Sequence, residues 1–330
     1  MIKLSVAKGN SFAASAVNMH AVSDTKLDST SKAYNVGVVG IDVNEAKTIS
    51  DSTVLVGVDI GDKDYRSDAV LHISADNNPV QSAYTDGLGV GVVYSTINNE
   101  SNAEANLTTD VTVNGTGNGA GMKSLSVSSN ASATHHLYAN GDGGGLISIS
   151  PYAASVESNF NFDTKTNIKG KIAAAKTEAD SSSSFAAYTG VEATGGTLAG
   201  GNGTEAKVNA TVNTKTNVLD NASINSKEIV LNSENNFVTG SEKINHNSYG
   251  ANYGGFAGSG NESKQHITAN SEVNIGKAAK LNASDSIRID ANTIYNLSNK
   301  VLSKGAGVGI HPYCTADNDL TINNLVTTAE

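Results

Sequence analysis

The chain of 330 residues has no tryptophan, three prolines and one cysteine, and only 5% of its residues are aromatic. Few large side chains are therefore available for one globular core, so the interior must use many small and β-branched residues in thin layers. The single cysteine, Cys314, excludes an intrachain disulfide and a metal site made of paired thiolates. Pro79, Pro151 and Pro312 are the only residues unable to donate a backbone hydrogen bond to a sheet.

Charge is also scarce, at 16% of residues, and its balance is negative, with a formal net charge of −10. Arg66 and Arg288 are the only arginines. Nucleic-acid binding needs clustered basic residues, so the sequence predicts no nucleic-acid partner and no polybasic membrane contact. No stretch approaches the ~20 apolar residues of a membrane span, and residues 1–10 lack the apolar run of a secretory signal.

What the chain does contain is a long repeat. Residues 270–292 and residues 215–233 agree in where apolar or very small residues stand. Val273 corresponds to Thr216, a separation of 57 positions, and Ile287 corresponds to Ile229, a separation of 58 after one inserted residue. Periods of this size are typical of stacked repeat architectures.

Each repeat has three parts. The first is a glycine-punctuated apolar run, expected to be a strand that is buried on one side and closely approached on the other. The second is a long alternating strand, as in residues 104–113 and 205–218, and the third is a short strand ending at an Asn or Asp turn. The copy at residues 172–180 is rich in alanine, which leaves a short helix open. Six glycine runs are visible, at residues 36–41, 87–93, 143–149, 195–201, 254–258 and 305–310.

These features predict an all-β fold, a right-handed parallel β-helix (β-solenoid) built from degenerate repeats of about 55 residues. We expect each repeat to divide into about three coils of roughly 18 to 20 residues. That division gives roughly 17 coils and a rod about 80 Å long at the ~4.8 Å strand spacing. Because the pattern is already running at Leu4 and still running at Leu325, residues 1–330 are interpreted as a single repeat region cut from a longer exoprotein.

Candidate metal sites are weak. His135 and His136 are adjacent, so on a strand they point to opposite faces and cannot chelate one ion; they are interpreted as surface or turn residues. Asp59, Asp62 and Asp64 form an acidic cluster around a glycine, which leaves a weak calcium site as the alternative to a solvated loop, although the bidentate Glu of a calcium loop is missing. The prediction is no metal ligand and no cofactor.

Catalytic patterns are equally sparse. The G-x-G runs are not followed by a helical pattern, so a phosphate-binding loop is not expected. Arg288 with Asp290, and Arg66 with its neighbouring aspartates, lack the surrounding acids, aromatics and His of a polysaccharide-cleaving site. The pairs Thr164/Thr166 and Thr214/Thr216 suggest an ice-binding array, which was discounted because they recur once per repeat and not once per expected coil. No catalytic residue is predicted, and the chain is not expected to be an enzyme.

The glycine-rich runs alternating with strands such as residues 216–233 and 273–292 resemble the repeat region of filamentous-haemagglutinin-type adhesins, and most closely the leukotoxin-like filamentous adhesins. The resemblance implies a very long bacterial exoprotein, secreted through a partner pore or as an autotransporter. It carries over no functional residue, because the repeat region of that family has no defined catalytic motif.

The resulting hypothesis is a structural and adhesive rod segment of a secreted or cell-surface, outer-membrane-associated protein. Its expected partners are glycans or surface proteins of host or neighbouring cells, and further repeats of its own parent chain at both ends. Uncapped coils would also permit end-to-end self-association. The alternatives are a passive stalk without a ligand and a polysaccharide-active β-helix enzyme. Three segments are predicted to be binding loops: residues 57–68, 138–145 and 241–253.

Overall fold

The computed structural model describes the chain except for residues 11, 62–66, 117–120 and 330. The described residues form strands and turns. Among them there is no helix long and apolar enough to cross a membrane. The strand pairings are parallel, and several strands far exceed the roughly 3–10 residues that are usual. In chain order the strands are β1 (Ile2–Val6), β2 (Ala16–Ile60), β3 (Val70–Gly115), β4 (Met122–Val218), β5 (Ser223–Ser241), β6 (Ser248–Ile275), β7 (Lys280–Asn296) and β8 (Val301–Thr328).

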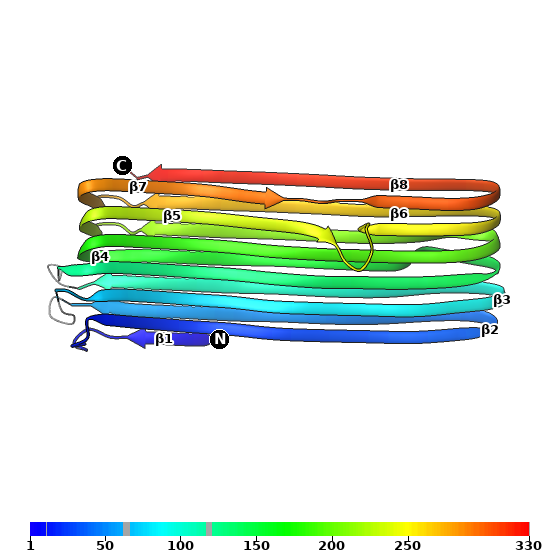
Figure 1. Cartoon of the computed structure of the whole chain (residues 1–330), viewed down its shortest axis with the longest axis horizontal. Helices are drawn as coiled ribbons and strands as arrows, with labels where there is room; N and C mark the ends of the chain where they lie inside the picture. Colours follow the sequence, from blue (N-terminus) through cyan, green and yellow to red (C-terminus); the bar gives the residue numbers. More distant parts are fainter. Residues whose placement is uncertain (11, 62–66, 117–120, 330) are drawn as a thin grey trace.

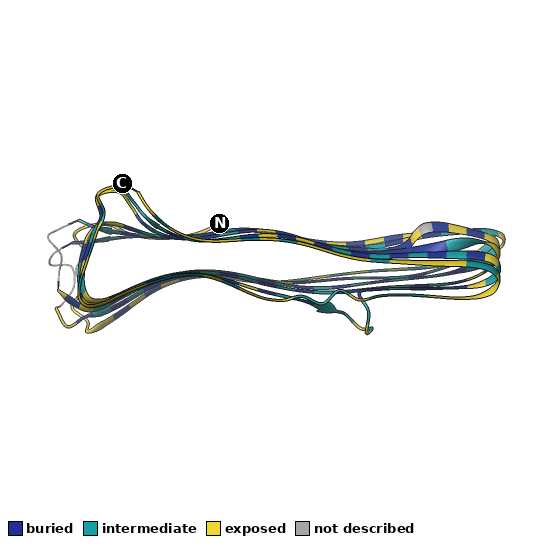
Figure 2. Cartoon of the chain, turned by 90° about the horizontal axis from the view of Figure 1, so that it is seen from above, coloured by how far each residue is buried: buried dark blue, intermediate teal, exposed yellow. Residues whose placement is uncertain are grey.

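The chain winds as a flattened solenoid in which each coil lies directly on the one before it (Figure 1). Ile168 lies opposite Val218 and Glu228 pairs with Ser286, so equivalent residues of neighbouring coils are 50 to 58 positions apart. Within a coil the chain runs along one layer, bends, and returns along a second layer (Figure 2). These registers divide the described strands into six coils, which begin at Ala16, Val70, Met122, Lys171, Ser223 and Lys280.

One repeat therefore makes one coil. The predicted division of each repeat into about three coils was wrong, and so was the predicted 80 Å rod. Six coils at ~4.8 Å rise only about 25 to 30 Å, whereas one arm of a coil, such as residues 16–38, spans roughly 75 Å at ~3.3 Å per residue. The longest dimension accordingly lies along the strands and not along the solenoid axis, and the molecule is a slab (Figure 1).

Alternation explains the long strands. In residues 104–113 of β3, buried and partly exposed positions alternate without a break, as predicted. The alanine-rich segment 172–180 is also strand within β4 and pairs with β5, not a helix. The predicted turns at Asn residues were wrong: Asn77 lies inside β3, fully buried, and its Nδ2 donates to the carbonyl oxygen of Ser52 at 3.1 Å. A side-chain amide that donates into the interior in this way does not need to end the strand.

The repeat read from the sequence is reproduced by the pairing. Thr216 pairs with Val273 between β4 and β6, and Ile229 pairs with Ile287 between β5 and β7. The register shift that separates these two offsets falls between Ser226 and Glu228. The single inserted residue inferred from the sequence is therefore an irregularity in the ladder.

The interior consists of four apolar clusters separated by buried polar layers. The largest cluster lies nearest the end of the slab where turns such as residues 219–222 join the coils, which we call the turn end. The next contains Phe160, Phe162, Phe185 and Phe237, three of whose rings stack with centroids 4.4 and 4.6 Å apart. Two small clusters lie toward the opposite end. Aromatic stacking between coils is consistent with register pairing of Phe185 with Phe237.

The opposite end, which we call the bend end, is formed by the six glycine runs. There the backbones of neighbouring coils approach closely: a Cβ at Gly200, where φ is 145°, would overlap the carbonyl oxygen of Ser148. The close approach predicted for these runs is confirmed, and the runs lie inside strands as predicted, with Gly87, Gly89 and Gly91 of β3 buried at alternate positions. The chain also bends at these runs and exposes apolar side chains there.

Candidate binding surfaces

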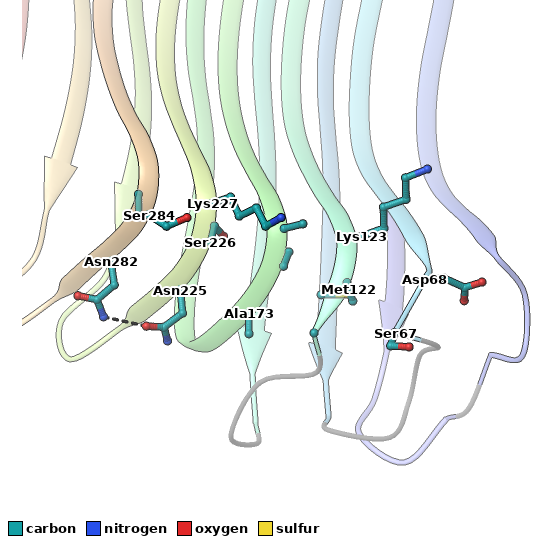
Figure 3. A pocket seen from close by; sticks show the side chains of 14 residues that line it. Ser67, Asp68, Met122, Lys123, Ala173, Asn225, Ser226, Lys227, Asn282 and Ser284 are labelled. Atoms are coloured by element: carbon teal, nitrogen blue, oxygen red, sulfur yellow. Dashed lines mark hydrogen bonds between the residues drawn. The ribbon is translucent and has the colours of Figure 1, made fainter.

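A groove of about 840 Å³ crosses successive coils at the turn end (Figure 3). Met122 and Ala173–Ala175 contribute small and apolar surface, while Asn225 and Asn282 contribute side-chain amides. The groove exists because the same position of each coil carries a small or short side chain. The described lining residues are Ser67, Asp68, Gly121, Met122, Lys123, Ala173, Ala174, Ala175, Asn225, Ser226, Lys227, Asn282, Ala283 and Ser284.

Polar groups recur along this groove at the coil spacing. Ala173, Asn225 and Asn282 are register partners in three coils, and Asn282 Nδ2 donates to Asn225 Oδ1 at 2.8 Å. Both amides are exposed and keep further donor and acceptor capacity. Lys227 lies near this pair, whereas Lys123 lies beyond Ala173, toward Asp68 (Figure 3). Both lysines are exposed.

This arrangement suits an extended polar ligand that lies across the coils. Amides and ammonium groups bind hydroxyl and carboxylate oxygens, and the short side chains leave room for the ligand. Asp68 is the one carboxylate among the described lining residues, so the paired carboxylates of glycoside hydrolysis are not found there. The groove has the chemistry of a binding surface.

A second surface is covered by the loop between β5 and β6, residues 242–247, which folds against the outer face of the sheet (Figure 1). Lys243 Nζ lies 4.0 Å from the ring centroid of Tyr84 and 4.6 Å from that of Tyr138, which are register partners on β3 and β4. Glu242 Oε2 lies 2.9 Å from Nδ1 of His136. The loop thereby bridges three coils through cation–π and ionic contacts.

The aromatic and polar groups below this loop are engaged with one another. Tyr138 donates to Glu192 Oε2 at 3.1 Å, and burial and then the charge of Glu192 raise the pKa of the Tyr138 phenol. Asn247 is fully buried, and its Nδ2 donates to Thr189 Oγ1 at 3.0 Å and to the Gly240 carbonyl at 2.8 Å. The loop therefore holds neighbouring coils together, and it covers the rings of Tyr84 and Tyr138, which are not available for sugar stacking.

A third surface, on the outer face of β4, β5 and β7, contains a cleft of about 410 Å³ that is rich in carboxylates. Glu178, Asp180, Glu234 and Asp290 line it together with Arg288, whose Nε donates to Asp290 Oδ2 at 2.5 Å. Burial, followed by the charge of Glu178, raises the pKa of Asp180 to about 6. In the described part of the chain, no group of three or more His, Cys, Asp or Glu side chains is disposed to hold a metal ion.

The two adjacent histidines point to opposite faces, as predicted. The surface interpretation was wrong for His135, which is fully buried: its Nδ1 lies 2.8 Å from Ser158 Oγ and its Nε2 lies 3.0 Å from Gln81 Oε1. The ring also stacks on Phe160 with centroids 4.0 Å apart. Burial lowers the pKa of His135 to about 3, so the residue is a neutral part of the core.

The threonine pairs occupy two neighbouring coils, and in the coils on either side the register partners of Thr166 and Thr216 are Val111 and Val273, so the pairs do not form an array over the coils. Thr164, Thr166, Thr214 and Thr216 are also buried inside the slab. Thr214 Oγ1 donates to Ser183 Oγ at 2.7 Å, and Thr216 Oγ1 donates to Ser181 Oγ at 3.0 Å. These hydroxyls link the two layers through the interior and are not available at the surface.

The three predicted binding loops have different outcomes. Residues 138–145 lie inside β4, so the predicted loop there was wrong. Residues 241–253 contain the short loop 242–247, but the remainder belongs to β5 and β6. In the segment 57–68, residues 57–60 belong to β2, Asp68 lines the groove, and 62–66 lie outside the described residues, as do Asp62, Asp64 and Arg66 of the acidic cluster. Asp59 accepts a hydrogen bond from Asn114 Nδ2 at 2.9 Å.

Sequence reasoning missed the groove, although a signal was present. Asn225 and Asn282 stand 57 positions apart, which is the separation already recognised in the repeat. Exposed residues at one repeat separation share a column on the surface once a repeat is known to make one coil. The chain matches no family model, no curated protein and no solved structure.

Proposed function

We propose that the chain is a structural and adhesive segment of a secreted or surface-anchored bacterial filamentous adhesin. The observation that supports this proposal best is the groove at the turn end, where side-chain amides of two successive coils lie in one row and Lys123 and Lys227 line the same groove. The parallel ladder that runs through six coils supplies a stiff support for that row. The proposed ligands are extended glycans or surface proteins of host or neighbouring cells.

The slab shape changes how such a segment contributes. Each coil of about 55 residues adds only ~4.8 Å along the axis, so the chain gains width and stiffness at the expense of reach. Many stacked coils would present a long row at the turn end, where one groove position is repeated in each coil. Binding of a polymeric ligand by several weak, equally spaced contacts gains strength from their number.

The test measures binding of the labelled chain to epithelial cells and to a panel of glycans and matrix proteins. The groove variant is Asn225→Ala with Asn282→Ala, and we expect saturable binding to weaken at least tenfold. The matched control is Asn270→Ala with Asn323→Ala, because Asn323 Nδ2 donates to Asn270 Oδ1 at 2.8 Å on a broad face of the same two coils. Equal binding by both variants would remove the groove from the proposal, and absence of saturable binding by the unaltered chain would leave a passive stalk.

A polysaccharide-active enzyme is the second candidate, and the carboxylate-lined cleft is the observation that favours it. A carboxyl group whose pKa is raised to about 6, such as Asp180, can serve as a general acid beside a second, ionised carboxylate. The described lining of the cleft contains no aromatic side chain for sugar stacking. Release of reducing ends from a polysaccharide panel, abolished by Asp180→Asn, would establish this activity in place of simple binding.

A further inference from the structure

The bend end of the slab carries one exposed apolar side chain or more from each of the six coils. The outermost of these are Val38, Val92, Leu146, Leu198, Phe256 and Val308, which we call the bend ridge. Their exposed fractions run from 52% for Leu146 to 88% for Val308. A soluble protein seldom exposes a continuous row of this kind, so the ridge needs a partner.

The register brings the apolar side chains of neighbouring coils together. Gly37 pairs with Gly91 and Val39 with Tyr94, which places Val38 against Val92 and Val93. In the fifth coil Gly255 stands opposite Leu198 and Val308, and Phe256 protrudes one residue further along the chain. With one step of ~4.8 Å per coil, the ridge is about 24 Å long.

Charge distinguishes this edge from the rest of the surface. The described residues of the six bends, at 36–43, 87–96, 143–150, 194–201, 253–260 and 305–311, include one carboxylate, Asp42, which is buried, and no Lys or Arg. The whole chain carries a formal charge of −10. Two copies repel each other over their charged broad faces, and the bend ridge is an edge along which they can approach without that repulsion.

We propose that the bend ridge is a lateral docking surface for a second copy of this chain. A second copy presents the same apolar row with the same ~4.8 Å step, so protruding side chains of one copy seat between those of the other along the whole row. Anionic membranes fit less well, because the described residues of the six bends contain no Lys or Arg, and Lys304 is the one lysine directly next to them. The narrow edge buries little area per coil, so affinity rises with the number of coils that meet.

Sedimentation equilibrium of the full chain over a range of concentrations tests the proposal. The ridge variant, Leu146→Lys with Leu198→Lys and Phe256→Lys, is expected to weaken self-association at least tenfold. The control is Asn161→Lys with Thr211→Lys and Thr268→Lys, three exposed positions of the same coils on a broad face, which introduces the same charge. Circular dichroism confirms that both variants remain folded.

Each alternative result overturns the proposal in a distinct way. A chain that stays monomeric at millimolar concentration has no such surface. Association that survives in the ridge variant runs through the open edges of the end coils. Flotation of the unaltered chain with zwitterionic lipid vesicles, lost in the ridge variant while the unaltered chain remains monomeric, would assign the ridge to a membrane. The experiment is independent of the groove and of its ligand.

Discussion

At the scale of single residues, the polar layers of the interior determine how the slab responds to pH. His135 is neutral in the folded chain, held between Ser158 and Gln81, and its pKa is lowered to about 3 by burial. The unfolded chain binds a proton at this histidine below its ordinary pKa near 6.5. Its neutral form therefore supports folding above pH 6.5, and that support is lost as the pH falls from 6.5 toward 3.

We expect the free energy of unfolding to decrease by about 3 kcal/mol between pH 7 and pH 4 on account of this one group. His135→Gln, which retains hydrogen bonding to Ser158 without the titrating ring, should flatten that dependence. Urea denaturation at a series of pH values measures the effect. A wild-type slope identical to that of the variant would contradict the assignment.

The ionisation of Asp180 affects the pH dependence of stability in the opposite direction from that of His135. Its pKa is raised to about 6 by burial and by Glu178, so the folded chain takes up a proton at a pH where the unfolded chain has already lost it. This carboxylate therefore opposes folding most strongly above pH 6, and the penalty fades as the pH falls from about 6 toward 4. After allowance for solvent screening, Asp180→Asn should stabilise the chain by about 1 kcal/mol at pH 7.5 and by nearly nothing at pH 3.5.

Thermal unfolding at both pH values checks this expectation. Asp285→Asn provides a control, because Asp285 is exposed and lies outside the cleft. Equal stabilisation by the two substitutions would show that net charge, and not the environment of Asp180, is responsible.

The sequence predicted correctly in which direction the side chains of His135 and His136 point, but it did not predict that His135 is buried. The opposite orientation of His135 and His136 follows from strand geometry alone. The burial of His135 depends on Gln81, 54 positions earlier, which comes into contact only when the coil length is known. The burial of the threonine pairs could not be predicted for the same reason, because their hydrogen-bond partners Ser181 and Ser183 lie on the facing layer.

At the scale of elements, the glycine bends are the least tolerant part of the fold. Gly200 has φ of 145°, and a Cβ there would overlap the Ser148 carbonyl of the coil below, whereas a Cβ at Gly196 meets no atom within 4 Å. Gly200→Ala should lower the free energy of unfolding by about 3 kcal/mol, through overlap and backbone strain together.

Gly196→Ala is the matched control in the same bend and should change stability by less than about 1 kcal/mol. Denaturant unfolding of both variants provides the comparison. A similar decrease in the free energy of unfolding for both variants would contradict the prediction, because the close contact at Gly200 would then have no specific effect.

The strands themselves were predictable as strands, but their ends were not. Alternation identified residues 104–113 correctly, since a period of two cannot be placed on a helix. Asn and Asp residues were interpreted as turns because they favour turns in isolated chains. Here Asn77, Asn130 and Asn235 instead lie inside β3, β4 and β5, and each strand continues past them.

At the scale of the whole molecule, one coil is the unit that can be removed. Val191 pairs with Ser248, so deletion of residues 191–247 joins Gly190 to Ser248 and restores the register with one coil fewer. We expect this shortened chain to fold, with a denaturant dependence reduced by roughly one sixth.

Deletion of about 19 residues from the same region should fail, because it removes only part of a coil and displaces every later pairing. Circular dichroism and urea unfolding of both deletions decide between them. Folding of the shorter deletion, with loss of the longer one, would support the small coils first expected from the sequence.

The glycine bends have one more consequence. A period of two is ambiguous, because a strand moved by two residues still sends the same kinds of side chain inward and outward. In strands as long as β4 many such displacements are available. A displaced coil would bring a side chain to the place of Gly200, where the Ser148 carbonyl leaves no room. The bends thus fix the register, because a new coil can pair with the preceding coil only where glycine meets the close backbone contact.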